Sequence, residues 1–309
     1  MDGCSRAAMA RYAVACGLMM GPMKAQLLRA TMRAVGHLPL PLLRALGRAG
    51  GILLWVSPSR QRRIAAQHLH RLFPDASPHV RRRLARRSLQ SLGCALMEST
   101  AIWYGPRARL LCWLDAPAAA ARLRRLADAA PGGAIVLCPH IGNWELAGMF
   151  CAHHGGITSL YKPQRGAVDA LVLAGRQRLG ARLVPSDGSG VRALLAALKR
   201  GERVGILPDQ DPPFGAGDFA PLFGVPAHTP TLVQRLAQRT GARVLYCYAE
   251  RSGAGTFRFH VKAAPEAGRS LRAMNASVEA CIMHLPDQYW WAYRRYRRRP
   301  PGHPEFYSD

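Results

Sequence analysis

The chain has 309 residues, of which 49% are apolar and 20% charged, a composition that argues against a disordered protein. It carries 43 Lys and Arg residues against 18 Asp and Glu, and the formal net charge of +25 implies an anionic partner: nucleic acid, phospholipid head groups, a phosphorylated substrate or an acidic carrier protein. The eight cysteines include no CxxC pair and several stand in apolar runs, which argues against a disulfide framework or a zinc site.

Residues 1–115 are predicted to form a basic helical region that associates with a membrane surface. Residues 1–130 hold 21 basic and 5 acidic residues, a net of +16, so most of the charge excess lies here. No run reaches the roughly 18–20 apolar residues that span a bilayer, and the uncharged run 12–23 is interrupted by glycine and proline. Short apolar runs that alternate with arginines favour an interfacial anchor, with an amphipathic helix packed on the core as the alternative. Helices are expected at 23–56, broken at Pro39 and Pro41, and at 59–72 and 78–104.

Residues 116–309 are predicted to form an α/β region that is continuous with the helical part as one domain, because no low-complexity linker separates them. Short apolar strands alternate with helical segments, which predicts a single, mostly parallel mixed sheet covered by helices. Strands are expected at 133–138, 157–161, 182–185, 203–207, 243–249 and 256–263. Helices are expected at 117–130, from about 143, and at 167–179, 189–200, 229–240 and 270–285.

The stretch HIGNWE follows the first of these strands and is the first candidate site. His140 lies just past the carboxyl end of the strand, which is the edge where open α/β sheets bind ligands. Glu145 falls in the first turn of a helix capped by Asn143, about 500° of helical rotation after His140, so the two can meet only if the turn folds back. A carboxylate on one imidazole nitrogen would leave the other free to take a proton from a hydroxyl. His140 is therefore a candidate base and Glu145 its partner, with a purely structural histidine as the alternative.

A second candidate site is the stretch ILPDQDPPFGAGDFAPLFG at 206–224, which is expected to be a loop after its first residues. The preceding strand ends at the same edge of the sheet, so Asp209 and Asp211 are expected near His140. The acidic pair could bind a metal or simply cap a turn. No third carboxylate lies close in sequence, so neither a metal nor another cofactor is expected.

The tail QYWWAYRRYRRRPPG interleaves aromatic and basic residues. This pattern suits stacking on nucleic acid bases and equally suits a lipid head-group layer. A nucleic-acid-binding protein is thus an alternative, but it would not explain why apolar strands deliver His140 and Asp209 to one edge. No GxSxG elbow is present, so direct attack by a substrate hydroxyl is preferred to a covalent acyl-enzyme.

Together these three stretches resemble the bacterial lipid A biosynthesis acyltransferases. The HxxxxE motif matches at His140 and Glu145, PDQD followed by PLFG is similar to a second block, and Trp291 to Pro300 is similar to a C-terminal signature. Weaker matches are LPLPLLRALGR, RRIAAQHLHRLFPD and YKPQ with GRQR, and His68 stands where the family usually has Asn. The Pro-Glu-Gly block of glycerol-phosphate acyltransferases is replaced by PDQD, which argues against that group, although a glycerol-phosphate-acyltransferase-like fold is expected.

The resemblance implies an enzyme on the cytoplasmic face of the bacterial inner membrane. It would move a fatty acyl chain from acyl carrier protein to a hydroxyl of a Kdo-bearing lipid A precursor. His140 would be the base and Glu145 its partner, while Arg176 in GRQR and Asp209 would bind substrate. A lysophospholipid or glycolipid acceptor is the alternative, no nucleic acid partner is expected, and both a spanning and a peripheral N-terminus fit the family.

Overall fold

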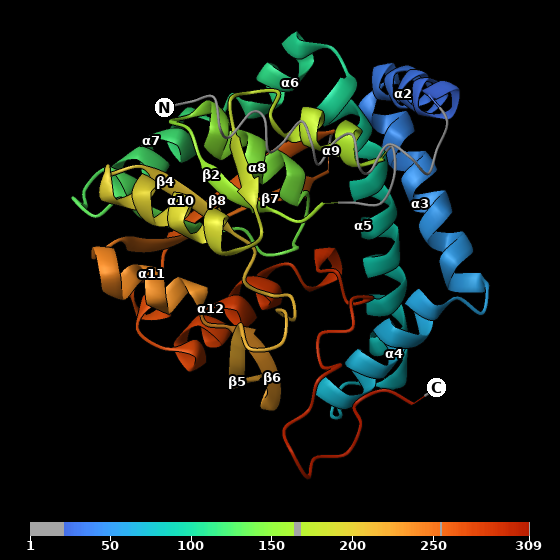
Figure 1. The fold of residues 1–309 in the computed structure, drawn as a ribbon. Helices are drawn as coiled ribbons and strands as arrows, with labels where there is room; N and C mark the ends of the chain where they lie inside the picture. The colour runs from blue at the N-terminus through green and yellow to red at the C-terminus, as the bar shows by residue number, and fades with distance from the viewer. Residues whose placement is uncertain (1–21, 164–167, 254, 309) are drawn as a thin grey trace.

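The computed structural model describes residues 22–163, 168–253 and 255–308. Helices α2 to α6 come first in the described part of the chain, and Figure 1 shows α2, α3 and α4 ranged along the outer side of the long helix α5. Their bounds are α2 Pro22–His37, α3 Leu40–Val56, α4 Arg60–Leu72, α5 Pro78–Tyr104 and α6 Arg107–Leu114. The predicted run 12–23 lies almost entirely outside the described residues.

The sequence predicted a helix break at both Pro39 and Pro41, but only Pro39 lies at the break between α2 and α3. Pro39 is the N-cap of α3, whereas Pro41 lies within its first turn. A proline is tolerated there because the amide hydrogen it lacks would have no helical partner. The short helix α6 was not expected from the sequence.

Helices α3 and α5 pack with their backbones in close contact. A Cβ added to Gly93 of α5 would lie 2.0 Å from the carbonyl oxygen of Gly47 in α3, and one added to Gly51 would meet the backbone of Gln90. Glycine at these positions is therefore a packing requirement. One face of α3 is fixed against α5, and its opposite face remains exposed.

The main sheet has six strands in the order β3-β2-β4-β1-β7-β8, all parallel except the edge strand β8. The predicted mostly parallel mixed sheet, covered by helices, is confirmed. Strand bounds are β1 Ala134–Leu137, β2 Thr158–Tyr161, β3 Arg182–Pro185, β4 Arg203–Ile206, β7 Arg243–Ser252 and β8 Thr256–Ala263. The helices after α6 are α7 Pro117–Ala127, α8 Trp144–His153, α9 Val168–Arg176, α10 Gly188–Lys199, α11 Leu232–Thr240 and α12 Leu271–His284, and a 3₁₀ turn, η3, covers Pro286–Gln288.

Strand β1 is buried on both faces because its residues alternate between two cores. Ile135 and Leu137 join a core that also contains residues of α4, α10, α11 and α12. Ala134 and Val136 join a second core with residues of α6, α7 and α8. This two-sided burial explains the uninterrupted apolar sequence of the strand.

A two-stranded hairpin, β5 Gly217–Leu222 and β6 Val225–Pro230, replaces the loop expected over most of 206–224 and the first residues of the helix expected at 229–240. Its turn residues Phe223 and Gly224 both have positive φ, as two-residue hairpin turns require. The proline pair Pro221 and Pro226 masks the strand pattern in the sequence.

Among the described residues no single helix is long and apolar enough to cross a bilayer. Helices α3 and α4 meet that criterion only as a pair, with a bend of 78° between them. Helix α5 packs against α8, α9 and η3 of the α/β part. The division of the chain at 115/116 stays a prediction.

Candidate active site

The register of the sheet brings His140 and Asp209 together. Strands β1 and β4 are parallel neighbours in which Leu137 pairs with Ile206. His140 and Asp209 each stand three residues beyond that pair, at the carboxyl ends of the strands. Both side chains are buried, so the predicted proximity of Asp209 to His140 is confirmed.

One carboxylate holds His140 by two hydrogen bonds. Oδ1 of Asp209 lies 2.9 Å from the ring Nδ1 of His140, and Oδ2 accepts the backbone N–H of His140 at 2.8 Å. Burial would raise the pKa of Asp209, but the charge of a protonated His140 ring and these hydrogen bonds outweigh it, so the pKa lies below its usual value. Asp209 is thus an ionised acceptor.

The expected contact between His140 and Glu145 is wrong, because no hydrogen bond or ion pair in the described structure joins them. Both carboxylate oxygens of Glu145 bind the guanidinium of Arg176 instead, with Nε 2.9 Å from Oε2. The indole N–H of Trp103 donates to the same Oε2 at 3.3 Å. Asp209 takes the position at the imidazole that was expected for Glu145.

The Glu145–Arg176 pair fixes a cation against the first turn of α8, the helix that follows His140 in the chain. Burial lowers the pKa of Arg176, but the neighbouring carboxylate of Glu145 more than compensates, so the pKa is raised and the guanidinium stays charged. The Arg176 side chain is still 33% exposed, whereas Glu145 is 7% exposed. The ion pair therefore leaves part of the charged Arg176 side chain exposed.

The turn between His140 and Glu145 is built from glycine and asparagine. Gly142 has φ +61°, and a Cβ there would lie 1.9 Å from the carbonyl oxygen of Ala249 in β7. The side chain of Asn143 accepts the backbone N–H of Leu146 and so caps α8. Only glycine fits the first position, and the cap starts the helix that carries Glu145.

A buried acid, Glu98 of α5, ties this turn to three other elements. Its Oε2 accepts Asn143 Nδ2 at 2.9 Å and Arg251 Nε at 2.7 Å, and its Oε1 accepts Arg44 Nε from α3 at 2.7 Å. Arg251 also donates to the carbonyl of Gly142 at 2.8 Å. The Glu98 network therefore connects helix α3 directly to the turn that positions His140.

Two tryptophans and a glutamine complete the surroundings of His140. The rings of Trp144 and Trp290 lie 5.1 and 5.4 Å from the imidazole, centroid to centroid, and stack on each other with a 9° angle between planes. The side-chain nitrogen of Gln210 lies 3.1 Å from His140 Nε2. Gln210 thus lies at the ring nitrogen that Asp209 does not bind, and the two indoles lie close to the imidazole.

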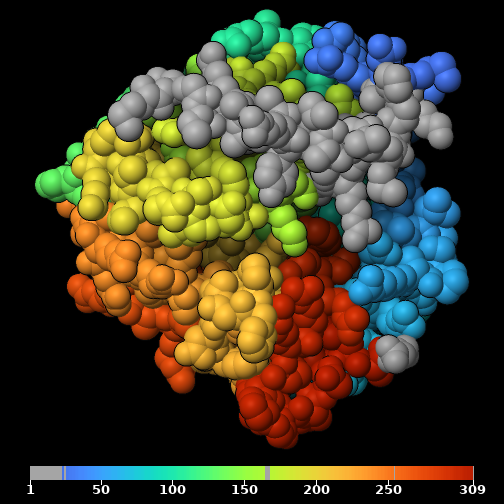
Figure 2. Space-filling model, viewed as in Figure 1, coloured from blue at the N-terminus to red at the C-terminus, as the bar shows by residue number. Residues whose placement is uncertain are grey.

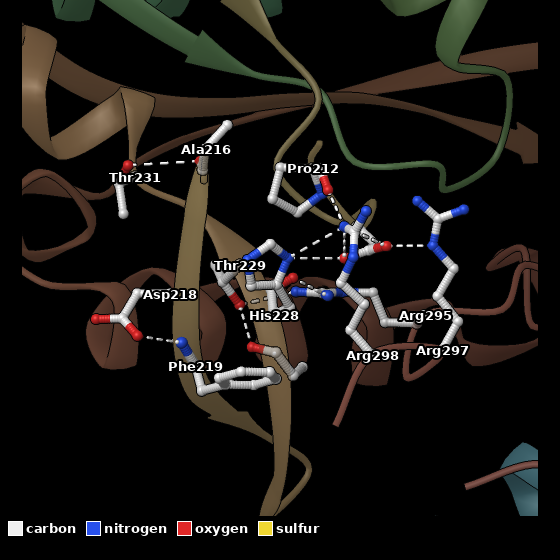
Figure 3. Close-up of polar contacts among 12 residues, drawn as sticks. Pro212, Ala216, Asp218, Phe219, His228, Thr229, Thr231, Arg295, Arg297 and Arg298 are labelled. Atoms are coloured by element: carbon white, nitrogen blue, oxygen red, sulfur yellow. Dashed lines mark hydrogen bonds and ion pairs between the residues drawn. The ribbon is translucent and has the colours of Figure 1, made fainter. Parts of the chain in front are cut away.

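Asp211 belongs to a different cluster from Asp209. Its carboxylate binds the ring Nδ1 of His228 at 2.8 Å and Arg298 at 2.9 Å, and it also accepts from Arg297. Figure 3 shows the side chains of His228, Arg297 and Arg298 from the hairpin and the tail pointing toward one another. Of the two aspartates expected near His140, only Asp209 is hydrogen-bonded to the imidazole in the described structure. Burial would raise the pKa of Asp211, but its hydrogen bonds and the arginine charges lower it. This cluster fastens the C-terminal tail to the β5–β6 hairpin.

Several aromatic residues of the tail are internal, although its sequence pattern suggested an exposed ligand-binding segment. Trp291 and Tyr296 are buried, and Arg295 donates to His228 O and to Thr229 Oγ1. Figure 2 shows the tail filling the space between the hairpin and α4. These aromatic rings are unavailable for stacking on nucleic acid bases.

Comparison with known proteins identifies the family. The model of the bacterial lipid A biosynthesis acyltransferases matches residues 20–298. The chain belongs to this family. It is 31% identical over 285 residues to the lipid A biosynthesis lauroyltransferase of Escherichia coli K12, across 88% of this chain and 91% of that relative.

Two further relatives show the range of the family. The lipid A biosynthesis palmitoleoyltransferase of the same strain is 28% identical over 279 residues, across 88% of this chain and 90% of the relative. A phosphatidylinositol mannoside acyltransferase of Mycobacterium tuberculosis H37Rv is 32% identical over 132 residues, 40% of this chain and 41% of the relative. The chain described here is therefore an O-acyltransferase of the lipid A acyltransferase family, and the names of its relatives include more than one class of lipid.

Several residues around the site were not singled out from the sequence. Glu98 is the one acid of helix α5, in the otherwise apolar and small stretch CALMESTA, and that isolation was the available signal. Gln210 and Trp290 carried no such signal because their roles depend on the tertiary fold. Among the described residues no group of three or more His, Cys, Asp or Glu side chains has the arrangement of a metal site.

Proposed function

We propose that this chain is a late acyltransferase of lipid A biosynthesis that works at the cytoplasmic face of the bacterial inner membrane. It takes a fatty acyl chain from acyl carrier protein and esterifies a hydroxyl of a Kdo-bearing lipid A precursor. His140 removes the proton from that hydroxyl, which attacks the thioester carbonyl directly. The observation that carries the proposal is the buried His140–Asp209 pair at the ligand-binding edge of the sheet.

The hydrogen-bond partners of His140 support direct attack. Its Nδ1 faces Asp209 and its Nε2 faces Gln210, and within the described structure no serine, threonine or cysteine side chain bonds to the ring. A hydroxyl on the acceptor lipid then supplies the nucleophile, with no covalent acyl-enzyme. The oxygen attacks the thioester, the ester bond forms, the C–S bond breaks, and the proton passes through His140 to the leaving thiolate.

Arg176 is proposed to stabilise negative charge at the same site. Glu145 grips two of its guanidinium nitrogens and leaves a third of the side chain exposed. The negative charge is either the oxyanion of the tetrahedral intermediate or a phosphate of the acceptor lipid. In this proposal Glu145 orients Arg176, and Asp209 orients His140. The HxxxxE motif had suggested that Glu145 would orient His140.

The exposed surface of α3 supports attachment to a membrane surface. Leu42, Leu46, Leu53 and Val56 follow one face of this helix at helical spacing and are 44–66% exposed. Helix α5 begins with exposed arginines at positions 82, 83, 86 and 87 and has no acid in its first turn. An apolar face beside cationic side chains suits anionic lipid head groups, and the same charges suit an acidic carrier protein.

A glycolipid acceptor is the second candidate. The observation in its favour is the relative named as a phosphatidylinositol mannoside acyltransferase, whose similarity extends over 40% of this chain. That acceptor also offers a sugar hydroxyl and an anionic phosphate to the same His140 and Arg176. The two candidates differ in the acceptor and share the chemistry.

The test is transfer by the purified full-length chain from a radiolabelled acyl carrier protein thioester to a Kdo-bearing lipid A precursor, with the product mass read by mass spectrometry. His140→Ala is expected to reduce transfer by about 100-fold or more, the usual weight of a general base. His153→Ala, at an exposed histidine, is the matched control. Full activity of His140→Ala would contradict the mechanism. Transfer to a mannosylated phospholipid but not to the lipid A precursor would favour the glycolipid as the acceptor.

A further inference from the structure

The hydrogen-bond geometry defines which nitrogen of His140 carries its proton. An ionised carboxylate can only accept hydrogen bonds, so the contact between Asp209 Oδ1 and His140 Nδ1 places a hydrogen on Nδ1. In the neutral ring Nε2 then presents a lone pair. This lone pair is the one that must accept the proton of the acceptor hydroxyl.

Gln210 already occupies that lone pair. Its amide nitrogen lies 3.1 Å from His140 Nε2, and an amide N–H can donate there but cannot accept a proton from an alcohol or attack a thioester. Gln210 directly follows Asp209 in the loop after β4. Two successive residues therefore hold the two ring nitrogens, one orienting the base and the other covering it.

The remaining surroundings strengthen this cover. His140 is only 6% exposed, and Trp144 and Trp290 lie against its ring. A water molecule can be deprotonated by His140 only after it displaces the amide of Gln210, and water makes no further contacts that would offset the lost hydrogen bond. A lipid acceptor can offset the loss of one neutral hydrogen bond, about 1 kcal/mol, with its many other contacts.

We propose that Gln210 is a placeholder for the acceptor hydroxyl, which holds His140 Nε2 until the lipid displaces it and thereby limits hydrolysis of the acyl donor by water. The inference rests on the proposed function, because it assumes a thioester donor and His140 as base. In the side reaction, water attacks the thioester carbonyl, the C–S bond breaks, and a free fatty acid and a thiol are released. Gln210 thus determines the choice between the acceptor hydroxyl and water.

The experiment compares two rates for each protein: release of free fatty acid from the acyl carrier protein thioester without acceptor, and ester formation with acceptor present. Gln210→Ala is expected to raise hydrolysis about fivefold relative to transfer, the weight of one neutral hydrogen bond. Gln238→Ala, at an exposed glutamine of α11, is the matched control and leaves the ratio unchanged. An unchanged ratio in Gln210→Ala, or a parallel fall of both rates, would overturn the proposal.

A second variant separates this role from a merely structural one. Gln210→Glu places a carboxylate opposite Nε2, so that His140 faces an acceptor at each nitrogen and is driven towards its protonated form. Both rates are expected to fall near neutral pH and to recover at higher pH. A pH dependence identical to that of the wild type would contradict the assignment.

A spectroscopic measurement keeps the failure of the two proposals distinguishable. In protein carrying ¹⁵N-labelled histidine, the Nε2 signal of His140, assigned with His140→Ala, is expected to shift in Gln210→Ala without any substrate. Absence of transfer by the wild type together with this shift would overturn the proposed function alone. Transfer by the wild type without the shift would overturn the placeholder.

Discussion

Asp209 holds His140 at both its ring and its backbone, with Oδ1 2.9 Å from Nδ1 and Oδ2 2.8 Å from the backbone nitrogen. Two bonds to a single carboxylate leave the imidazole little freedom to rotate about its side-chain torsions. They also determine its tautomer, because an ionised carboxylate only accepts. The strand register that aligns β1 with β4 is therefore part of the catalytic apparatus in the proposed mechanism.

Asp209→Asn is expected to reduce acyl transfer about 100-fold or more while leaving the chain folded. The amide can donate to Nδ1, which would move the ring hydrogen to Nε2 and remove the lone pair that the acceptor hydroxyl needs. Steady-state transfer rates and a circular dichroism spectrum measure the two effects. Wild-type transfer by this variant would show that the bond to Asp209 has no catalytic weight.

Asp211→Asn is the matched comparison, two residues along the same loop. Asp211 binds His228, Arg297 and Arg298, and its loss leaves these groups without their shared carboxylate. The expected cost is a lower free energy of unfolding, about 3 kcal/mol for a broken buried ion pair, with transfer per folded molecule retained. Chemical denaturation distinguishes the two variants, since Asp209→Asn should change mainly the rate.

Glu145→Gln tests the role of the second acid in the HxxxxE motif. The amide would lose the ion pair with Arg176, so transfer is expected to fall roughly 10- to 100-fold through poorer charge stabilisation. The pH dependence of the remaining activity should keep its wild-type position, because Asp209 and not Glu145 bonds to the imidazole. A shift of the pH profile would restore Glu145 as the partner of His140.

A double-mutant cycle with Arg176→Gln strengthens this test. If Glu145 acts by orienting Arg176, the double variant should be about as slow as the slower single variant. Additive losses would show that the two residues act independently. The conservative variant Arg176→Lys should recover only part of the rate, since an ammonium cannot donate the two parallel hydrogen bonds that the guanidinium fork makes to Glu145.

The strand pattern and the sheet edge were predictable because each follows from local sequence. The apolar run AIVLC predicts a strand buried on both faces, and a polar residue just beyond it predicts a site. The identity of the carboxylate at His140 was not predictable in this way. The HxxxxE motif pointed to Glu145, whereas the carboxylate that binds the ring belongs to Asp209, which follows the neighbouring strand β4.

The hairpin and the tail show two other limits. Pro221 and Pro226 hide the strand pattern of β5 and β6, and the pairing becomes visible only in three dimensions. The tail alternates tryptophan, tyrosine and arginine as an exposed ligand-binding segment would. Tyr296 and Phe306 pack instead against His68, and each of these contacts spans more than 200 residues, which no local pattern records.

The exposed face of α3 provides a test of membrane attachment. Leu46→Glu combined with Leu53→Glu places two charges on an apolar surface and should reduce binding to vesicles containing phosphatidylglycerol about tenfold or more, as expected for losing two partly buried leucines. Met283→Glu, at a 53% exposed position on α12, is the control. Co-sedimentation measures the bound fraction, and an equal loss in the double variant and in the control would argue against a role specific to α3.

His68 links α4 to the tail in a way that depends on its neutral form. Its Nδ1 lies 2.6 Å from the carbonyl oxygen of Trp291, to which it donates, and its Nε2 accepts the hydroxyl of Tyr307 at 2.7 Å. Burial lowers the pKa of His68 from 6.5 to about 4, although the bond to the Trp291 carbonyl opposes this. A proton on Nε2 would break the bond from Tyr307.

The free energy of unfolding should therefore fall as the pH drops from 6.5 towards 4. Above pH 6.5 the ring is neutral in both states, and below it the unfolded chain gains a proton that the folded chain excludes, at a total cost of about 3 kcal/mol. His68→Asn can keep a donor and an acceptor without this titration, so its unfolding free energy should decline less over the same range. Urea denaturation at pH 7.5, 6 and 5 measures the difference, with His79→Asn, at an exposed histidine, as control. Parallel pH curves for the wild type and His68→Asn would show that His68 does not carry this acid sensitivity.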